Sequence, residues 1–449
     1  MFIDFLLEVF RENKGKEAII WNKEIYNYEY LLEQIEYWQN TLKHKNINNG
    51  CVAILEADFS PNTIALLLSL IEHRSIIVPL TNSTKSKQSE LIKIAQGEVL
   101  FSLVDKDYIE FKPLPDTANH LFFEKIRELS HPGLVLFSSG STGESKAAVH
   151  DFSKLLDKFR FKRHSLKVIN FLLFDHWGGL NTMFYVLSNG GTLVTVQSRN
   201  PDEVCKAIEK YKVDLLPTSP TFLNLLLLSE AYKRYDLSTL KTISYGTEPM
   251  LSSTLKKLKE IFPKTKLLQT YGLIEIGVLR SKSKSDDSLW VKVGGEGFET
   301  RIVDGILQIK ADSAMFGYLN APSPFTEDGW FNTGDSVEVD GDYIRILGRK
   351  SEIINVGGEK VFPVEVENVI LGMDNVSDAT VYGEKNPITG NIVCAKIKLK
   401  TNEDHKQFTT KLKNYCRERL QSYKIPVKVS IVDETQYSER FKKSRNMKT

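Results

Sequence analysis

Short apolar, β-branched segments alternate with helix-forming segments through the first 250 residues of this 449-residue chain. The expected strands include residues 18–21, 52–55, 76–80, 133–137, 168–174, 192–196 and 242–244. The expected helices include 28–42, 61–72, 153–163, 201–211, 220–228 and 252–261, and several of them begin with a Ser, Thr, Asp or Pro suited to a first turn. Such regular alternation predicts α/β layers with largely parallel sheets.

The pattern changes at about residue 289, where short alternating strands are separated by Gly and Asp. The turn pairs Asp328-Gly329 and Asp340-Gly341 indicate hairpins, which form a small barrel or a curled sheet. After Gly348 the sequence predicts a compact α+β unit, with helices near 363–371 and 404–420 and strands near 379–382 and 392–399. We therefore expect an N-terminal domain over 1–348, α/β to about 288 and β-rich over about 289–348, and a C-terminal domain over 349–449.

Composition and charge exclude several classes of protein. The apolar fraction of 41% and the net charge of +2 are ordinary for a soluble globular protein, and give no case for nucleic acid or membrane binding. Residues 349–449 hold 19 basic and 13 acidic residues, so this part could meet a polyanionic partner; a solvated charged face is the alternative interpretation. No secretory signal or membrane span is apparent. The four cysteines form no C-x-x-C pair, which indicates neither zinc nor disulfides and favours the cytoplasm.

The segment LVLFSSGSTGESKAAVH, residues 134–150, is the strongest single signal in the chain. An apolar strand leads into six small residues, and a lysine and a helix-compatible stretch follow. Small residues let the backbone curl so that several N–H groups point inward, while hydroxyls and a lysine add donors for anionic oxygens. The segment is not a Walker A loop, because Ala147 stands where that motif needs Ser or Thr. It predicts a polyphosphate site made by Ser138, Ser139, Gly140, Ser141, Thr142, Gly143 and Lys146.

This segment resembles the signature loop of the adenylate-forming superfamily, which includes acyl-CoA synthetases, adenylation domains of peptide synthetases, and luciferases. The resemblance implies that the loop handles the β- and γ-phosphates of ATP and the leaving pyrophosphate. It also implies a large N-terminal domain followed by a small, mobile C-terminal domain. The chain departs from the family at Ser145, where Pro is usual.

Two further motifs extend the resemblance toward the nucleotide base and the metal. The segment SYGTEPM, residues 244–250, resembles the lining of the adenine pocket, and the matching positions are Gly246, Thr247 and Glu248. The segment QTYGLIE, residues 269–275, resembles an element in which Tyr271 stacks near the adenine and Glu275 helps to hold Mg²⁺. A lone carboxylate is a suitable protein ligand for Mg²⁺ when phosphates supply the other oxygens. Ile274 replaces the family's Thr, which removes a polar contact to phosphate or metal.

The segments around residues 335 and 350 resemble the ribose site and the hinge of the family. In WFNTGD, residues 330–335, Asp335 is expected to accept hydrogen bonds from the ribose hydroxyls. In the segment that begins at Leu347, Arg349 would reach the ribose or a phosphate, and Ser351 falls at the hinge. Gly357 and Gly358 match a loop that lines the tunnel for the thiol acceptor, where a slim pantetheine arm passes close to backbone.

The terminal SERFKKSRN, residues 438–446, resembles the family's G-K-x-x-R ending, with Phe441 in place of Gly. Lys442 then takes the catalytic position, where it bridges the substrate carboxylate and the α-phosphate while negative charge grows on phosphorus. Lys443 is the alternative assignment, one residue out of register. A solvated basic tail is the interpretation that the residues would favour without the other motifs.

The segment LLFDHWGGLNTMF, residues 172–184, resembles the border of the acyl pocket. His176 would match a pocket histidine, or Asp175 would match the aspartate that holds an α-amino group; both alignments stay open. Trp177 and Gly178 would complete this wall, and the alternative is a His and a Trp packed in a core turn.

Together the motifs predict an ATP-dependent acid–thiol ligase that forms an acyl-AMP, with Lys442, Glu275 and Lys146 as catalytic residues. The expected cofactors are ATP and Mg²⁺, and the expected acyl acceptor is coenzyme A or the phosphopantetheine of a carrier protein. Two alternatives are an adenylating enzyme that passes the acyl group to an amine and a nucleotide-binding homologue without turnover. Ser145, Ile274 and Phe441 motivate the last.

Overall fold

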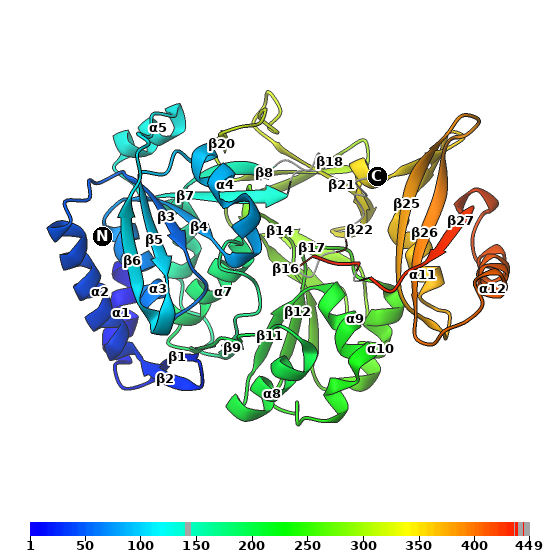
Figure 1. Ribbon diagram of the computed structural model, residues 1–449, viewed down its shortest axis with the longest axis horizontal. Coiled ribbons are helices and arrows are strands. Elements are labelled where there is room, and N and C mark those ends of the chain that lie inside the picture. Colours follow the sequence, from blue (N-terminus) through cyan, green and yellow to red (C-terminus); the bar gives the residue numbers. More distant parts are fainter. Residues whose placement is uncertain (140–144, 435, 439–442, 444–449) are drawn as a thin grey trace.

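The computed structural model describes residues 1–139, 145–434, 436–438 and 443. Its N-terminal part holds two large sheets and a β-rich unit, and a smaller unit lies beside them at the C-terminal end (Figure 1).

The first sheet has seven strands and is parallel except at one edge. Its order is β13 (Lys266–Gln269), β12 (Thr242–Tyr245), β11 (Leu215–Thr218), β9 (Lys167–Ile169), β10 (Thr192–Val194), β1 (Glu17–Trp21) and β2 (Glu24–Asn27). Only β2 runs antiparallel to its neighbour. The carboxyl ends of the parallel strands therefore meet at one edge, where ligands bind in open α/β sheets.

The second sheet also has seven strands. Its order is β20 (Gly317–Tyr318), β8 (Ser145–Asp151), β7 (Gly133–Ser139), β4 (Ile76–Leu80), β3 (Val52–Glu56), β5 (Val99–Leu103) and β6 (Ile109–Pro113). The four central strands β7, β4, β3 and β5 are parallel, and the outer three are antiparallel. The parallel layers predicted from the alternation are thus present in both sheets.

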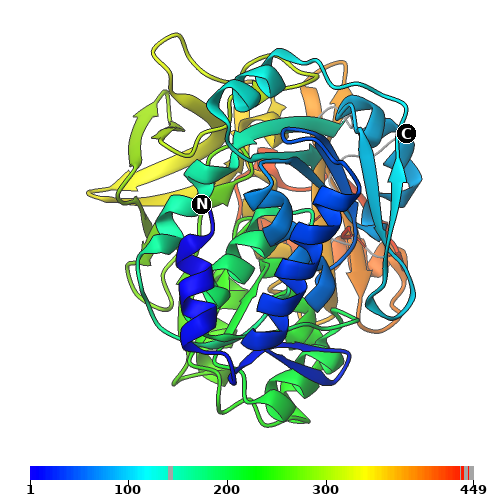
Figure 2. The same ribbon diagram turned by 90° about the vertical axis from the view of Figure 1, so that its left-hand side faces the viewer.

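Helices cover the faces of these sheets (Figure 2). Several begin as the sequence predicts: the side chains of Ser60, Asn200 and Ser219 accept hydrogen bonds from the first turns of α3, α8 and α9, each of which starts with Pro. The helices of this part are α1 (Asp4–Glu12), α2 (Tyr28–His44), α3 (Pro61–Glu72), α4 (Gln88–Ile94), α5 (Leu121–Leu129), α6 (Phe152–Leu156), α7 (Trp177–Leu187), α8 (Pro201–Tyr211), α9 (Pro220–Ser229) and α10 (Ser252–Ile261).

The β-rich unit is a six-stranded antiparallel sheet with β16 and β18 at its edges. Its order is β16 (Arg280–Ser283), β17 (Val291–Gly294), β22 (Tyr343–Arg349), β21 (Phe331–Asp340), β19 (Ile306–Ala311) and β18 (Phe298–Val303). The sheet begins before residue 289, because β16 precedes the first strand that the sequence predicts. A short ladder of β14 (Gly272–Leu273) and β15 (Gly277–Val278) connects it to the first sheet.

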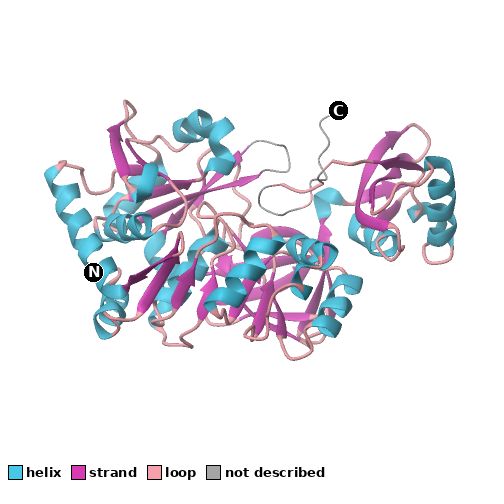
Figure 3. Ribbon diagram, turned by 60° about the horizontal axis from the view of Figure 1, so that its bottom comes forward, coloured by secondary structure: helices cyan, strands magenta, loops and turns pink. Residues whose placement is uncertain are grey.

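The C-terminal unit has its own apolar core. It also has its own sheet (Figure 3). Its order is β24 (Glu359–Val361), β23 (Ile354–Val356), β26 (Gly390–Leu399) and β25 (Val376–Asn386), and β27 (Lys428–Ile431) adds to β26 in parallel. Helices α11 (Pro363–Ile370) and α12 (His405–Arg417) pack on it. The predicted fold class is confirmed; the domain boundary at 348/349 stays a prediction.

Two local expectations are wrong. A helix does not follow Lys146: residues 145–151 form β8, which pairs antiparallel with β7 along its whole length. The expected strand 168–174 ends at Ile169, because the chain leaves the sheet before the turn into α7. None of the helices in the described part of the chain combines the length and the apolar character that crossing a bilayer requires.

Candidate active site

The predicted phosphate loop joins two paired strands that end side by side. Ser138 of β7 pairs with Lys146 of β8, and Ser139 pairs with Ser145. Asn320 fixes the start of β8, because its Nδ2 donates to the Ser145 carbonyl at 2.8 Å and its Oδ1 accepts from the Ala147 amide at 3.0 Å. Gly140, Ser141, Thr142 and Gly143 lie outside the described residues.

Tyr318 links two predicted catalytic residues. Its hydroxyl donates to Oε1 of Glu275 at 2.7 Å, and the ammonium of Lys146 lies 5.6 Å from its ring centroid. Burial, followed by the nearby Glu275 carboxylate, raises the pKa of Tyr318, so the phenol keeps its proton and remains a donor. Tyr318 occupies the short strand β20, which pairs with β8 at Ala148. Sequence reasoning missed it, because only this long-range pairing brings residue 318 beside residue 146.

Asp335 sits at the end of a second chain of contacts. The Tyr271 hydroxyl donates to its Oδ2 at 2.5 Å, and Nε of Arg349 lies 2.7 Å from its Oδ1. Asp335 is 6% exposed. Burial, followed by the Asp335 carboxylate, raises the pKa of Tyr271 well above its usual value. Burial opposes the charge of Arg349, yet the Asp335 carboxylate raises the pKa of Arg349 overall, so the guanidinium stays charged.

The segment predicted to line the adenine pocket follows β12 in a constrained turn. A Cβ on Gly246 would lie 2.4 Å from Oγ1 and 2.8 Å from the carbonyl oxygen of Thr270, so no side chain fits there. Thr247 adopts a left-handed conformation with φ of +74°. The Glu248 carboxylate accepts from the Thr221 amide at 2.7 Å, which fixes it against the first turn of α9.

The residues present fit a magnesium ion held mainly by nucleotide. No cluster of three or more His, Cys, Asp or Glu side chains suited to a metal occurs among the described residues. Glu275 offers one partly exposed carboxylate next to Lys146 and Tyr318. Mg²⁺ commonly takes one or two carboxylates and completes its shell with phosphate oxygens and water.

The segment predicted to border the acyl pocket forms the start of α7. His176 caps this helix, because its Nδ1 accepts from the Gly178 amide at 3.0 Å. Asp175 is 3% exposed, and its Oδ2 accepts from the Thr81 hydroxyl at 3.0 Å. Trp177 is 1% exposed and packs edge-on against Phe152. For Trp177 the structure favours the packed alternative, and Asp175 and His176 both stay candidates.

The predicted hinge and thiol-tunnel residues lie at the surface of the C-terminal unit. Ser351 is exposed in the 3-10 turn Lys350–Glu352. Gly357 and Gly358 form the turn between β23 and β24 with φ of +61° and +93°, and nothing lies within 4 Å of the Cβ that either position lacks. Positive φ explains the preference for glycine at both positions. Asn355 supports the turn, since its Oδ1 accepts from the Gly358 amide at 2.9 Å.

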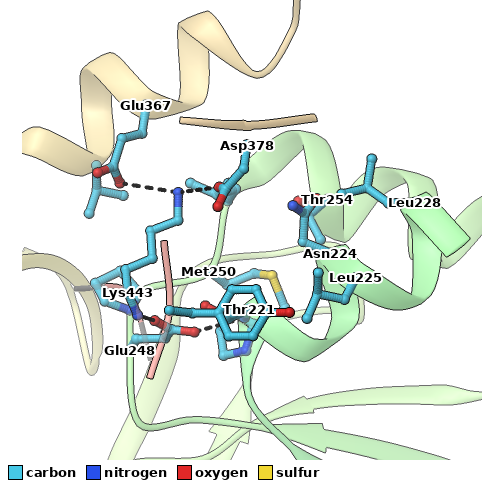
Figure 4. Close-up of a pocket in the computed structure, with 15 residues that line it drawn as sticks. Thr221, Asn224, Leu225, Leu228, Glu248, Met250, Thr254, Glu367, Asp378 and Lys443 are labelled. Atoms are coloured by element: carbon cyan, nitrogen blue, oxygen red, sulfur yellow. Dashed lines mark hydrogen bonds and ion pairs between the residues drawn. The ribbon is translucent and has the colours of Figure 1, made fainter. Parts of the chain in front are cut away.

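Lys442, the predicted catalytic lysine, lies outside the described residues. Its neighbour Lys443 is described, and it lies among Glu367, Asp378 and Glu248 (Figure 4). The Lys443 ammonium lies 3.1 Å from Oδ1 of Asp378 and 4.0 Å from Oε2 of Glu367, and it also donates to the Ala379 carbonyl. These partners, all in the C-terminal unit, occupy the ammonium, which has three protons to donate. This occupancy argues against Lys443 as the lysine that meets substrate.

Comparison with known proteins identifies the family of this chain. Residues 49–305 match the family described as AMP-binding enzyme, and residues 365–446 match the AMP-binding enzyme C-terminal domain. A 2-succinylbenzoate--CoA ligase from Bacillus licheniformis is 26% identical over 444 residues, which are 90% of either chain. A 4-coumarate--CoA ligase-like 9 from Arabidopsis thaliana is 28% identical over 361 residues, covering 73% of this chain but only 63% of its own length.

A solved structure shows the same fold. The anthranilate CoA ligase AuaEII in complex with anthranoyl-AMP superposes with a TM-score of 0.80 at 19% identity, over 96% of this chain and 93% of that one. The resemblance noted from the motifs is thus confirmed at the level of family and fold.

Proposed function

The chain belongs to the family of AMP-binding enzymes, and from that premise we propose that it activates a small carboxylic acid as its acyl-AMP and transfers the acyl group to a thiol. The observation that carries this proposal is the meeting of Lys146, Tyr318 and Glu275, which come from β8, β20 and the turn after β14. A cation, a neutral phenol donor and a carboxylate suited to Mg²⁺ gather at the mouth of a small-residue hairpin. That set matches the needs of a triphosphate.

In the first half-reaction a carboxylate oxygen of the acid attacks the α-phosphorus of ATP. The bond between the α-phosphorus and the bridging oxygen breaks, and pyrophosphate leaves with that electron pair. The hairpin 138–146 holds the departing phosphates through backbone N–H groups and Lys146, Glu275 contributes to Mg²⁺ binding, and Lys442 offsets charge at the α-phosphate. Bound Mg²⁺ supplies charge neutralisation at the phosphate oxygens.

In the second half-reaction a thiol attacks the acyl carbon, AMP leaves, and the thiol proton passes to solvent. Coenzyme A or a carrier-protein phosphopantetheine provides the thiol. Rotation of the C-terminal domain about Ser351 would carry the exposed Gly357–Gly358 turn toward the acyl-AMP. Such domain movements complete many catalytic sites, and closure over the mixed anhydride would limit its hydrolysis. The CoA ligases among the relatives support a thiol as acceptor.

The test is ATP–pyrophosphate exchange over a panel of aliphatic, aryl, hydroxy and amino acids, with the wild type and Lys442→Ala. We expect acid-dependent exchange in the wild type and a loss of roughly 10²–10³ in the variant, which should still bind ATP. Lys448→Ala, another lysine of the terminal segment, is the matched control and should keep its exchange. Unchanged exchange in Lys442→Ala would remove that residue from the mechanism.

Product analysis separates the acceptors. Incubation with coenzyme A, a phosphopantetheinylated carrier protein or simple amines should yield a thioester with one of the two thiols. An amide as the sole product would favour the amine-transferring alternative. ATP binding without exchange for any acid would favour a nucleotide-binding protein without turnover.

A further inference from the structure

Lys443 contacts both parts of the molecule, through different atoms. Its ammonium binds Asp378, Ala379 and Glu367 in the C-terminal unit. Its backbone amide donates to Oε2 of Glu248 at 3.2 Å, in the segment predicted to line the adenine pocket. The side chain of Lys443 is 11% exposed, and that of Glu367 only 1%. A lysine so enclosed, between two carboxylates and a carbonyl, is a built site and not a solvated tail.

The two carboxylates are themselves fixed by backbone. Oε1 of Glu367, on α11, accepts from the Val381 amide at 2.9 Å, and Oδ1 of Asp378, on β25, accepts from the Ala379 amide at 2.9 Å. They cannot easily turn to solvent if the lysine is removed. The ion pairs therefore attach the terminal segment to α11 and β25, and an isolated buried charge would remain without them.

The same place is where the C-terminal unit meets the first sheet's helices. Nδ2 of Asn224, on α9, lies 3.5 Å from the Ser377 carbonyl, and the Ser252 amide donates to Oδ1 of Asn368 at 3.2 Å. Ser377 and Asn368 are the sequence neighbours of Asp378 and Glu367. Glu248 also accepts a hydrogen bond from the Thr221 amide in the first turn of α9. Its bond to Lys443 therefore joins the C-terminal unit to α9 through a single carboxylate.

A second contact holds the terminal segment at Lys443. An antiparallel bridge pairs Tyr437 with Lys443. Lys442 directly precedes Lys443 in the sequence, and consecutive Cα atoms lie about 3.8 Å apart across a trans peptide. Anchoring Lys443 therefore limits where the chain can place Lys442.

We propose that Lys443 is a positioning residue for adenylation: its ammonium fastens the terminal segment to the C-terminal unit, its amide docks that segment on Glu248, and Lys442 is thereby presented to the nucleotide. This inference rests on the proposed function for its catalytic consequence. The ammonium contacts move with the C-terminal unit, whereas the Glu248 contact breaks when that unit rotates. The anchor therefore serves the first half-reaction and not the second.

The test compares Lys443→Met with Lys424→Met. Lys424 is the matched control, because its ammonium pairs with Glu365 on the same helix at 2.7 Å and its side chain is 14% exposed. We expect Lys443→Met to lower acid-dependent ATP–pyrophosphate exchange by about tenfold to a hundredfold, mainly in kcat, since displacing a catalytic group by about 1 Å has effects of that size. Transfer from synthetic acyl-AMP to the thiol should stay within about twofold of wild type. Lys424→Met should change neither half-reaction.

An equal fall in both half-reactions of Lys443→Met, or exchange within about twofold of wild type, would overturn the proposal. Lys443→Arg, which restores a cation, should recover part of the lost exchange. Hydrogen exchange of the terminal segment gives a readout that needs no turnover. The segment should exchange faster in Lys443→Met than in Lys424→Met, and equal rates would refute the anchor even if the wild type proved unable to adenylate any acid.

Discussion

The hydroxyl of Tyr271 donates to Oδ2 of Asp335 at 2.5 Å, and Arg349 holds the other oxygen of the same carboxylate at 2.7 Å. Tyr271 precedes β14, Asp335 lies in β21 and Arg349 ends β22, so the candidate nucleotide site lies where the first sheet meets the β-rich sheet. A carboxylate fixed in this way before ligand binds loses little side-chain freedom when ribose hydroxyls arrive.

Replacement of Asp335 by Ala should therefore weaken ATP binding. Hydrogen bonds to a charged group are worth about 1.5–3 kcal/mol each, so we expect a Kd raised by about tenfold to a hundredfold. Calorimetric titration with ATP, without any acid present, measures this directly. Asp340→Ala is the control, because Asp340 ends the same strand but is exposed and pairs with Lys284. Equal affinities in the two variants would exclude Asp335 from the nucleotide site.

Ile274→Thr restores the family's residue at a position where the chain departs from the motif. Ile274 is 8% exposed and belongs to the largest apolar core. Its replacement by Thr removes apolar packing and places a hydroxyl group in an apolar environment. We expect the free energy of unfolding to fall by about 1–3 kcal/mol, as measured by urea denaturation.

Ile302→Thr is the matched control for this change, since Ile302 lies in strand β18 and is 38% exposed. Its stability should change by less than about 0.5 kcal/mol. A more stable Ile274→Thr protein would show that residue 274 faces a polar site and not the core.

Much of the fold follows from local sequence. Helices α3, α8 and α10 have the predicted bounds. A Ser–Pro or Asn–Pro start together with apolar periodicity marks α3 and α8, whereas apolar periodicity alone marks α10. The stretch after Lys146 could not be assigned in this way. Its alanines suit a helix, and only pairing with β7 and β20 makes it a strand. Tertiary pairing commonly overrides local preference in short segments.

The candidate site likewise contains residues that local sequence predicts and residues that it does not. Asp335, Tyr271 and Glu275 stand in motifs that local sequence displays. Tyr318 and Lys443 act through partners that are distant in the chain. Tyr318 contacts Glu275, 43 residues earlier, and Lys443 contacts Ala379, 64 residues earlier. No spacing rule within one segment predicts such contacts, because they depend on how distant segments pack together in the fold.

Substitution of Gly357 by Leu should affect thiol transfer and leave adenylation intact. Nothing lies within 4 Å of a Cβ built on Gly357, so a leucine side chain has space there. That side chain would narrow the path that the glycine turn is proposed to line for pantetheine. We expect a higher KM for the thiol with unchanged pyrophosphate exchange. Gly341→Leu is closely matched, because Gly341 also lies in a hairpin turn, with φ of +58° against +61°, and also has open space. Equal kinetics in the two variants would remove Gly357 from the thiol path.

The last prediction concerns acid stability and His150. This side chain is 0% exposed in β8, and burial lowers its pKa from 6.5 to about 4. Between these two values the unfolded chain binds a proton that the folded protein does not. Stability from this group is therefore complete above pH 6.5 and falls as the pH drops toward 4, by up to about 3 kcal/mol.

His150→Gln should flatten this loss, since glutamine does not titrate. Urea unfolding at about pH 7 and about pH 5 gives the difference for each protein, so a constant loss of stability in the variant does not affect the comparison. His44→Gln, at an exposed position near the end of α2, should keep the wild-type dependence. Carboxylates that titrate in the same range are common to all three proteins, and the contrast between the variants therefore isolates the buried imidazole. The same slope in His150→Gln and wild type would mean that His150 takes up its proton without unfolding.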